Sequence, residues 1–343
     1  MPATHKKILV IRNDKLGDFM LAWPAFALLK DCYPESEITA LVPAYTAEIA
    51  AQCQWIDRVL IDDKQPSFIN DVLQLSRNIR QHSFDASVSL FSEARTSIAL
   101  WLAGIPIRLG PATKLAQLFL NRRLKQKRSR SLKPEFQYNL DLARYYIKLN
   151  GDSCQQERST PFMSFDAGEI RAMREDYRTR HNISDTTRMI IIHPGSGGSA
   201  INLSLQQYAD LARSITSSVE AFFVITAGPG EENTAEQLSG LLQGLDHQVH
   251  RSTTGIVDFC KFIDCCDLFI SGSTGPLHIA GALNVNTAAF YPARKSATSL
   301  RWETLNAEDK RISFSPERYT GENDMQQINT EQAADDISNK FFR

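Results

Sequence analysis

The sequence predicts an α/β protein made of two Rossmann-like halves, each a parallel sheet with helices on both faces. The first observation is length, because 343 residues exceed one ordinary core and suit two domains. The second is that short apolar runs alternate with amphipathic stretches along most of the chain. The third is that these runs are continuously apolar, which is typical of strands buried on both faces of a parallel sheet.

The first half is expected to contain four strands separated by helices. The strands are predicted at Ile8–Ile11, Ile38–Val42, Val59–Ile61 and Ala86–Leu90. Amphipathic patterns predict helices at Phe19–Cys32 and Phe68–Gln81. The alternation then weakens, and helical patterns dominate at Thr113–Asn121, Glu135–Leu149 and Ala167–His181.

The second half repeats the alternation of strand and helix. Its strands are predicted at Met189–His193, Ala221–Thr226, Leu268–Ser271 and Thr287–Tyr291. Its helices are predicted at Leu205–Ser217, Asn233–Leu242 and Pro276–Leu283. The polar segment Asn150 to Ser159 has the composition of an interdomain linker.

These elements predict a domain of residues 1–160, a domain of residues 161–325 and a C-terminal segment 326–343. The helix of that last segment, from Thr330, can fold back across the first domain. Ligands of open α/β sheets bind beyond the carboxyl ends of the strands, so the site is expected in a cleft between the halves.

The composition limits the classes of function. A formal net charge of −1 argues against a protein that binds nucleic acid over its whole surface. The six cysteines show no CxxC pair and no matching histidine spacing, so we expect no metal site. We expect the cysteines to be reduced thiols in a cytosol. Neither a signal peptide nor a run of about 18 apolar residues is present. We therefore expect a cytoplasmic protein or one peripheral on a membrane, and a monomer.

The segment from Leu268 to Tyr291, LFISGSTGPLHIAGALNVNTAAFY, is the most informative part of the sequence about function. It predicts a strand, a turn of small residues and a short helix with Pro276 as its first residue. The free N–H groups of Thr274, Gly275 and Leu277 would then gather at the positive end of this helix, where phosphate binds. A plain tight turn is the alternative, and the small polar residues Ser273 and Thr274 beside His278 favour phosphate binding.

A second loop, RNDKLGDFMLAWPAF, follows the first strand. Asp18 is either an ordinary first-turn acid that complements the helix dipole or a general base at the edge of the sheet. Asp14 is a rival for the same role, and Lys15 and Arg12 could hold an anionic ligand. Position alone does not decide between them.

Two further loops follow strands of the second half. In IIIHPGSGGSAINLS the amides of Gly195 and Ser196 could approach a pyrophosphate, although the dinucleotide fingerprint GxGxxG is absent. His193 is expected to be a hydrogen-bonded structural residue rather than a catalyst. In VITAGPGEENTAEQL, Glu231 or Glu232 is either a ribose-binding carboxylate or an ordinary first-turn acid.

Taken together, the loops resemble those of the ADP-heptose:lipopolysaccharide heptosyltransferases, glycosyltransferase family nine. The resemblance is carried, in family order across residues 6 to 291, by KILVIRNDKLGDFMLAWPAFALLK, IIIHPGSGG, TAGPGEE and SGSTGPLHIAGAL. It implies the GT-B architecture, with two Rossmann-like domains that face a central cleft. It also implies an inverting transfer without an essential metal or cofactor.

The resemblance assigns roles to individual residues. Asp18 falls on the family's catalytic base, which takes the proton of the acceptor hydroxyl. Thr274 and Gly275 fall on the amides that hold the donor pyrophosphate, and His278 falls on the last residue of that motif. Glu231 falls near the glutamate that contacts the donor ribose. With Gly195, Ser196 and Ser273 these residues form the expected donor site, and the expected donor is ADP-heptose.

The chain departs from the family pattern at two points. The family often follows its central glycine loop with Lys-x-Trp-Pro, whose lysine neutralises donor phosphate, whereas this chain has Ile201-Asn202-Leu203-Ser204. Ser273 stands where an acidic residue often opens the last motif. Loss of a charge-assisted phosphate contact can cost a few kcal/mol. Lys15, Arg294 and Lys295 are candidate replacements for the cation.

A basic segment supplies the expected acceptor site. Between Ala94 and Pro134 the chain has ten Lys or Arg residues and no Asp or Glu, and seven of the ten lie in Arg122–Lys133. Such a segment is a solvated loop, a nucleic-acid patch or a surface for anionic lipid. The resemblance favours a phosphorylated inner-core glycolipid at the inner face of the bacterial inner membrane, bound by Lys15, Arg122, Arg123 and Lys125, and no nucleic acid.

Three functions remain open. The first is an inverting heptosyltransferase with Asp18 as base. The second is a sugar-nucleotide epimerase of similar architecture, which would alter the donor without an acceptor. The third is a non-catalytic donor-binding relative, suggested by the absent lysine. A nicotinamide dehydrogenase is disfavoured because its glycine fingerprint is missing.

Overall fold

The computed structural model describes residues 6–113, 115–154, 158–198, 201–252, 254–317 and 323–343. The chain divides into two compact units. The first holds residues 1–129 and 133–159, and the second holds residues 130–132 and 160–343. The main division, after Ser159, falls at the end of the polar segment, of which residues 155–157 lie outside the described residues.

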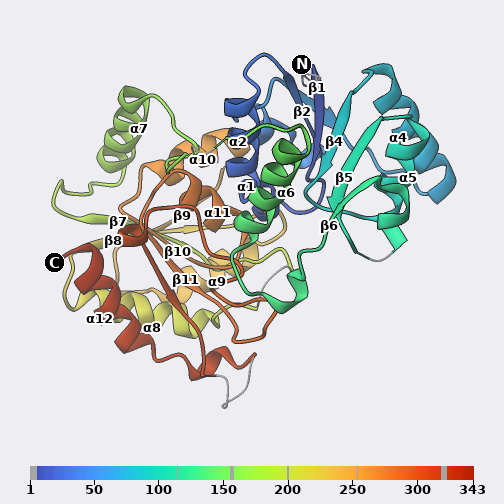
Figure 1. Ribbon diagram of the computed structural model, residues 1–343. Helices are drawn as coiled ribbons and strands as arrows, with labels where there is room; N and C mark the ends of the chain where they lie inside the picture. Colours follow the sequence, from blue (N-terminus) through green and yellow to red (C-terminus); the bar gives the residue numbers. More distant parts are fainter. Residues whose placement is uncertain (1–5, 114, 155–157, 199–200, 253, 318–322) are drawn as a thin grey trace. The chain divides into compact units, whose positions relative to one another are not determined.

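The first unit contains a six-stranded parallel sheet with strand order β3-β2-β1-β4-β5-β6 (Figure 1). Val10 of β1 pairs with Ala40 of β2 on one side and with Val88 of β4 on the other, which places β1 inside the sheet. The strands are β1 (Lys7–Ile11), β2 (Glu37–Val42), β3 (Arg58–Ile61), β4 (Ala86–Ser89), β5 (Ile107–Pro111) and β6 (Arg122–Leu124).

Helices cover both faces of this sheet. Leu9 and Ile11 of β1 belong to a buried cluster with α4 and α5, and the alternate residues Ile8 and Val10 are equally buried on the other face. Helix α6 packs on β4 and β5 and against α2. The helices are α1 (Leu16–Met20), α2 (Trp23–Cys32), α3 (Ala47–Ala50), α4 (Phe68–Gln81), α5 (Ala94–Leu102) and α6 (Glu135–Leu149), with 3₁₀ turns η1 (Ala44–Thr46), η2 (Leu115–Phe119) and η3 (Arg128–Arg130).

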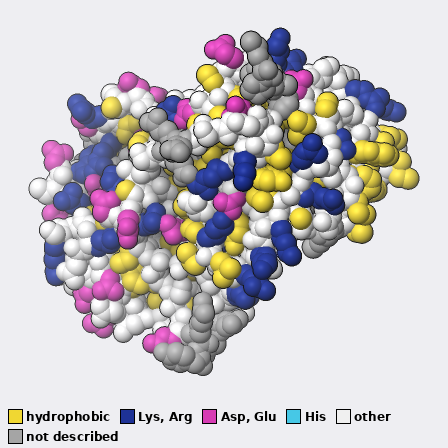
Figure 2. Space-filling model, viewed as in Figure 1, with side chains coloured by type: hydrophobic (Ala, Val, Ile, Leu, Met, Phe, Trp, Pro, Cys, Tyr) yellow, Lys and Arg dark blue, Asp and Glu magenta, His cyan; other side chains and the backbone are white. Residues whose placement is uncertain are grey.

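Two parts of the first unit differ from the sequence prediction. The helix expected at Phe19–Cys32 is two helices, because Pro24 has no N–H to continue the hydrogen bonds of α1. The helix expected at Thr113–Asn121 is the 3₁₀ turn η2, and strand β6 follows within the basic segment. Figure 2 shows Lys, Arg and hydrophobic side chains gathered over the margin of this unit that holds α4, α5 and β6.

The second unit contains another six-stranded parallel sheet, with strand order β12-β11-β10-β7-β8-β9. Ile192 of β7 pairs with Ile270 of β10 and with Ile225 of β8, so the carboxyl ends of these three strands lie together at one edge. The strands are β7 (Arg188–His193), β8 (Ala221–Thr226), β9 (His247–His250), β10 (Leu268–Gly272), β11 (Thr287–Phe290) and β12 (Arg311–Phe314). Strands β5, β6, β9 and β12 were absent from the sequence prediction.

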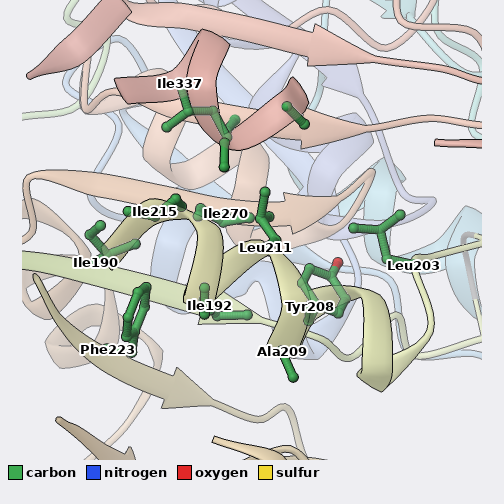
Figure 3. Close-up of a cluster of buried hydrophobic side chains, with 14 of the residues drawn as sticks. Ile190, Ile192, Leu203, Tyr208, Ala209, Leu211, Ile215, Phe223, Ile270 and Ile337 are labelled. Carbon is green, nitrogen blue, oxygen red and sulfur yellow. The ribbon is translucent and has the colours of Figure 1, made fainter. Parts of the chain in front are cut away.

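One face of this sheet carries a large buried cluster (Figure 3). Ile192 and Ile270 of the sheet pack there with Tyr208 and Leu211 of α8 and with Ile337 of α12. The helices are α7 (Ala167–Arg180), α8 (Leu205–Thr216), α9 (Glu232–Leu241), α10 (Ile256–Asp264), α11 (Gly275–Ala282) and α12 (Thr330–Phe341), with 3₁₀ turns η4 (Glu308–Lys310) and η5 (Met325–Gln327). The buried face of the C-terminal helix α12 thus belongs to the core of the second unit, whereas the sequence suggested a return to the first.

Candidate active site

Asp18 lies in the first turn of α1, directly after the carboxyl end of β1. The buried side chain of Arg12, only 2% exposed, organises this turn. Its Nε lies 2.9 Å from Asp14 Oδ1, its Nη2 lies 2.5 Å from Asp18 Oδ1, and its Nη1 lies 2.9 Å from Glu135 Oε1. A guanidinium presents five donors in a fixed plane, so it can hold several acceptors at once.

The same guanidinium also joins this turn to helix α6. Nη1 of Arg12 donates to Asn139 Oδ1 at 3.0 Å, and Asn139 Nδ2 donates to the carbonyl of Leu21 at 3.0 Å. Glu135 accepts a second hydrogen bond, at 2.7 Å, from Nη1 of Arg128. The sequence suggested that Arg12 holds an anionic ligand, but its donors bind carboxylates and an amide of the chain itself.

Burial and crowding raise the pKa of both candidate bases. Burial is the main cause for Asp14, whose pKa rises to about 7 although Arg12 lowers it. Burial also raises the pKa of Asp18, again against the opposing effect of Arg12. One guanidinium therefore holds both carboxyls, while the charge of Asp18 further raises the pKa of Asp14 and the charge of Glu135 further raises the pKa of Asp18. Asp14 is further fixed by the hydroxyl of Tyr45, which donates to its carbonyl at 2.6 Å.

A second buried cluster lies beside the first and was not recognised in the sequence. Asn13 Nδ2 donates to Asp62 Oδ2 at 2.5 Å, and Arg95 binds both Asp62 and Asp71. Thr96 donates from its hydroxyl to Glu93 at 2.9 Å. Asn13 and Asp62 follow β1 and β3, Asp71 lies in the first turn of α4, and Glu93, Arg95 and Thr96 lie at the start of α5, so the cluster forms at the carboxyl edge of the sheet. The sequence signal for this cluster is weak. Asn13 and Arg95 could have been suggested as site residues only because each follows a predicted strand.

In the second unit, Glu231 binds the glycine loop that follows β7. Its Oε1 accepts hydrogen bonds from the backbone N–H of Ser196 at 2.7 Å and of Gly197 at 2.6 Å. A Cβ added at Gly195 would lie 1.9 Å from Glu231 Oε2, so only glycine permits this approach. Glu231, the carboxylate predicted to bind the donor ribose, thus holds the loop of Gly195 and Ser196 through these hydrogen bonds.

Asn202 connects this loop to the end of β10. Its Nδ2 donates to the carbonyls of Pro194 at 2.8 Å and Gly195 at 3.0 Å. A Cβ added at Gly272 would lie 1.5 Å from Asn202 Oδ1. In the rest of the segment that replaces the family's Lys-x-Trp-Pro, Leu203 is buried in the core and Ser204 caps α8 with Gln207 in a capping box.

The N-terminus of α11 has the geometry expected of an anion site. Thr274 caps the helix through its hydroxyl, which accepts from the N–H of Leu277 at 3.4 Å and lies 3.1 Å from Ser271 Oγ. Within the described residues, no hydrogen bond of the chain uses the N–H of Thr274 or Gly275. Free N–H groups at a helix start attract anions, so this end of α11 can receive phosphate.

Both histidines of the second-unit site are neutral at pH 7. Burial lowers the pKa of His193 to about 4, and its Nδ1 lies 3.0 Å from Thr226 Oγ1, as expected for a structural residue. Burial likewise lowers the pKa of His278 to about 4. Nδ1 of His278 has no partner among the described residues, and its ring lies 6.5 Å from that of Trp302. His278 therefore offers a neutral polar group one turn into α11.

The cations predicted for the ligands are exposed. Lys15 caps α1 by position, Arg122 and Arg123 lie on the edge strand β6, and Lys125 follows that strand. Among the residues that the structure describes, no group of His, Cys, Asp or Glu is placed to hold a metal ion.

Comparisons with known proteins agree on one family. A family model described as glycosyltransferase family 9 (heptosyltransferase) matches residues 72–331. A Haemophilus influenzae protein with the general name glycosyltransferase is 43% identical over 311 residues, which cover 91% of this chain and 89% of that protein.

Solved structures extend the similarity to the fold. The crystal structure of a family 9 glycosyl transferase from Veillonella parvula has a TM-score of 0.80 at 17% identity and covers 99% of this chain and 98% of that one. The ADP-heptose LPS heptosyltransferase II of Escherichia coli has a TM-score of 0.75 at 18% identity, with 98% of each chain covered.

Proposed function

This chain belongs to glycosyltransferase family 9, the heptosyltransferase family, and we propose that it moves a heptose from ADP-heptose to an inner-core lipopolysaccharide or lipooligosaccharide. It is a glycosyltransferase, and its fold is GT-B. The observation that carries the proposal is the N-terminus of α11, with the free N–H groups of Thr274 and Gly275, in the same unit as the glycine loop. Asn202 binds the glycine loop and lies against Gly272 at the end of β10. The free N–H groups of Thr274 and Gly275 suit a phosphate of a nucleotide-diphosphate sugar, whereas the N–H groups of Ser196 and Gly197 in the glycine loop already bind Glu231.

The proposed step is a single displacement at the anomeric carbon of the donor. Asp18 takes the proton of the acceptor hydroxyl while the new O–C bond forms. The bond from that carbon to the diphosphate oxygen breaks at the same time, so the configuration inverts. The leaving diphosphate gains negative charge, which the N–H groups of Thr274 and Gly275 stabilise. His278, neutral and buried, is proposed to contact the donor from the same helix.

Ser273, beside these groups, is proposed as a further donor contact that brings no negative charge toward the diphosphate. A cation is still needed to replace the family's lysine. Arg294 and Lys295 are exposed in the segment after β11. The same segment carries Trp302, whose ring lies near that of His278. We propose that this segment supplies the cation, since a charge at the leaving group strengthens the phosphate contacts.

The first unit is proposed to bind the acceptor, a phosphorylated glycolipid, through Lys15, Arg122, Arg123 and Lys125. Guanidinium and ammonium groups suit phosphate and acidic sugars. In the described part of the chain no helix is both long and apolar enough to cross a membrane. We propose that the enzyme acts as a monomer at the inner face of the inner membrane, where such an acceptor is made.

The experiment that tests the base compares Asp18→Asn with the unchanged enzyme. Transfer should fall by about 100-fold or more, because the proton acceptor is lost, while nucleotide-sugar binding stays. Asp14→Asn is the matched control, since Asp14 binds the same guanidinium. Normal transfer by Asp18→Asn together with loss in Asp14→Asn would move the base to Asp14.

A thermal-shift panel of nucleotide sugars tests the donor. ADP-heptose should raise the melting temperature, and no stabilisation by any ADP- or GDP-linked sugar would contradict the donor assignment. Incubation with donor alone distinguishes an epimerase, which would release an altered sugar nucleotide. Donor binding without turnover on any truncated core acceptor would identify a non-catalytic relative.

A further inference from the structure

Three large apolar side chains are exposed at the end of α5 and in η2, two elements that pack against each other. Trp101 is 52% exposed, Leu115 is 70% exposed and Leu118 is 69% exposed. In a 3₁₀ helix the side chains at i and i+3 eclipse, so Leu115 and Leu118 share one face of η2. The rings of Trp101 and Phe119 lie 5.8 Å apart, which joins this face to the end of α5.

The segment that presents these side chains is well anchored. Ala116 and Leu120 are its buried residues, so the exposed leucines are not the ones that attach it to the core. Beneath it, Nε of Arg108 donates to the carbonyl of Phe119 at 2.9 Å. Asn121 donates to the carbonyl of Pro106 at 2.7 Å. The apolar face is therefore held outward by the fold.

The chain continues from this face directly into cations. Arg122 and Arg123 are exposed on β6, and Lys125 is exposed just after it. No Asp or Glu lies between Ala94 and Pro134. Basic residues on an edge strand protect it from pairing with other strands, but that role does not require exposed leucines and a tryptophan beside them. Figure 2 shows apolar and basic side chains together over this margin of the unit.

We propose that the apolar–basic surface formed by Trp101, Leu115, Leu118, Arg122, Arg123 and Lys125 docks the enzyme on a bilayer that contains anionic phospholipid. The apolar side chains enter the boundary of the acyl chains, where an indole ring is favourable, and the cations bind lipid phosphate. Charge complementarity selects this occupant over a neutral partner. The inference deepens the proposed function, in which the acceptor is a glycolipid, because docking would bring the enzyme to it.

Vesicle co-sedimentation tests the surface with no donor or acceptor present, so a failure of the proposed transfer reaction does not affect it. The protein should bind vesicles of phosphatidylglycerol and phosphatidylcholine and not vesicles of phosphatidylcholine alone. Leu115→Ser with Leu118→Ser should lower the partition coefficient at least tenfold. Each cation lost, as in Arg122→Gln or Arg123→Gln, should lower it about fivefold.

Matched variants distinguish binding through this surface from non-specific adsorption to vesicles. Ile69 is 69% exposed and Leu73 is 39% exposed, both on α4 of the same unit, so Ile69→Ser with Leu73→Ser removes comparable apolar area. Arg171 and Lys340 are exposed in the second unit, so Arg171→Gln with Lys340→Gln removes the same charge as the Arg122 and Arg123 variants. Both control pairs should keep vesicle binding, and all variants should keep the melting temperature.

Tryptophan fluorescence locates the contact. Of the four tryptophans, Trp23 and Trp55 are buried and Trp302 is half-buried in the second unit, so Trp101 is the exposed indole placed to move from water into lipid. Anionic vesicles should shift the emission of the unchanged protein to the blue, and Trp101→Phe should remove that shift. The proposal would be overturned if the α4 control lost vesicle binding or if the Leu115/Leu118 variant kept it. A change of oligomeric state in the Leu115/Leu118 variant would also overturn it, because the surface would then be a contact between copies of the chain.

Discussion

At the scale of single residues, the decisive feature is one guanidinium that serves three carboxyls. Arg12 is buried with Asp14, Asp18 and Glu135, so the cluster holds more acidic groups than the cations inside it can neutralise. A buried carboxyl in such surroundings keeps its proton to a higher pH. The pKa of the candidate base Asp18 is thus higher than that of an exposed aspartate, which favours proton transfer near pH 7.

Asp14 should make the protein less stable as the pH rises. The pKa of Asp14 is about 7 in the folded state and near its ordinary value of 3.8 when the chain is unfolded, so between these pH values the folded state holds a proton that the unfolded state has released. The free energy of unfolding therefore falls as the pH rises through this window, by at most about 1.4 kcal/mol per pH unit. Asp14→Asn lacks this dependence.

Urea unfolding at pH 5 and pH 8 measures the effect. The stability of Asp14→Asn relative to the unchanged protein should improve from pH 5 to pH 8. A constant difference between Asp14→Asn and the unchanged protein would show that Asp14 titrates normally.

At the scale of elements, the second-unit site is made of three strand ends and the loops that follow them. Side chains link these loops: Glu231, after β8, binds the loop after β7, and Ser271 Oγ donates to the carbonyl of His193 and lies 3.1 Å from Thr274 Oγ1 at the start of α11. Glu231 reaches back across 35 positions of sequence to fix the glycine loop. The N–H groups that remain free are therefore already in place before a donor arrives.

Gly195→Ala should disrupt this arrangement. The new Cβ would overlap Glu231 Oε2 and push the carboxylate off the loop. We expect donor affinity, measured by calorimetric titration, to fall at least tenfold. Gly240→Ala, inside α9 where a Cβ meets nothing within 4 Å, should keep donor affinity and gain up to about 1 kcal/mol of stability. Unchanged affinity in Gly195→Ala would remove the loop from the donor site.

The sequence predicted the central strands and α11 because each is a local pattern. A strand, small residues, Pro276 and a periodic apolar run suffice for α11. Strand β6 was not predicted because its three residues, two of them arginines, show no apolar pattern. A strand at the edge of a sheet does not require an apolar pattern. Arg12 and Glu135 are 123 positions apart, so their contact is a product of the fold that no local pattern encodes.

At the scale of the whole molecule, each unit has its own core. Ile79 of α4 is buried with the first sheet, and Ile337 of α12 is buried with the second. Two cores of this kind can unfold in separate steps. The C-terminal helix thus contributes stability to the unit that is proposed to bind the donor.

Calorimetric scanning should resolve the contributions of the two units. Ile337→Ala should destabilise the second unit by roughly 2–5 kcal/mol and lower its transition, because it leaves a cavity between α12 and α8. Donor nucleotide should raise that same transition. Ile79→Ala is the matched control and should lower the other transition. If both variants shift one common transition equally, the units unfold together.

The contact between Asn202 and Gly272 also restricts how this sequence can evolve. The amide oxygen occupies the space that a side chain at position 272 would need. A larger residue at 272 is tolerated only after Asn202 is replaced by something smaller, and that replacement removes the hydrogen bonds to Pro194 and Gly195. The two positions should therefore change as a pair across related enzymes, and the order of the two substitutions decides whether the intermediate sequence keeps its donor loop.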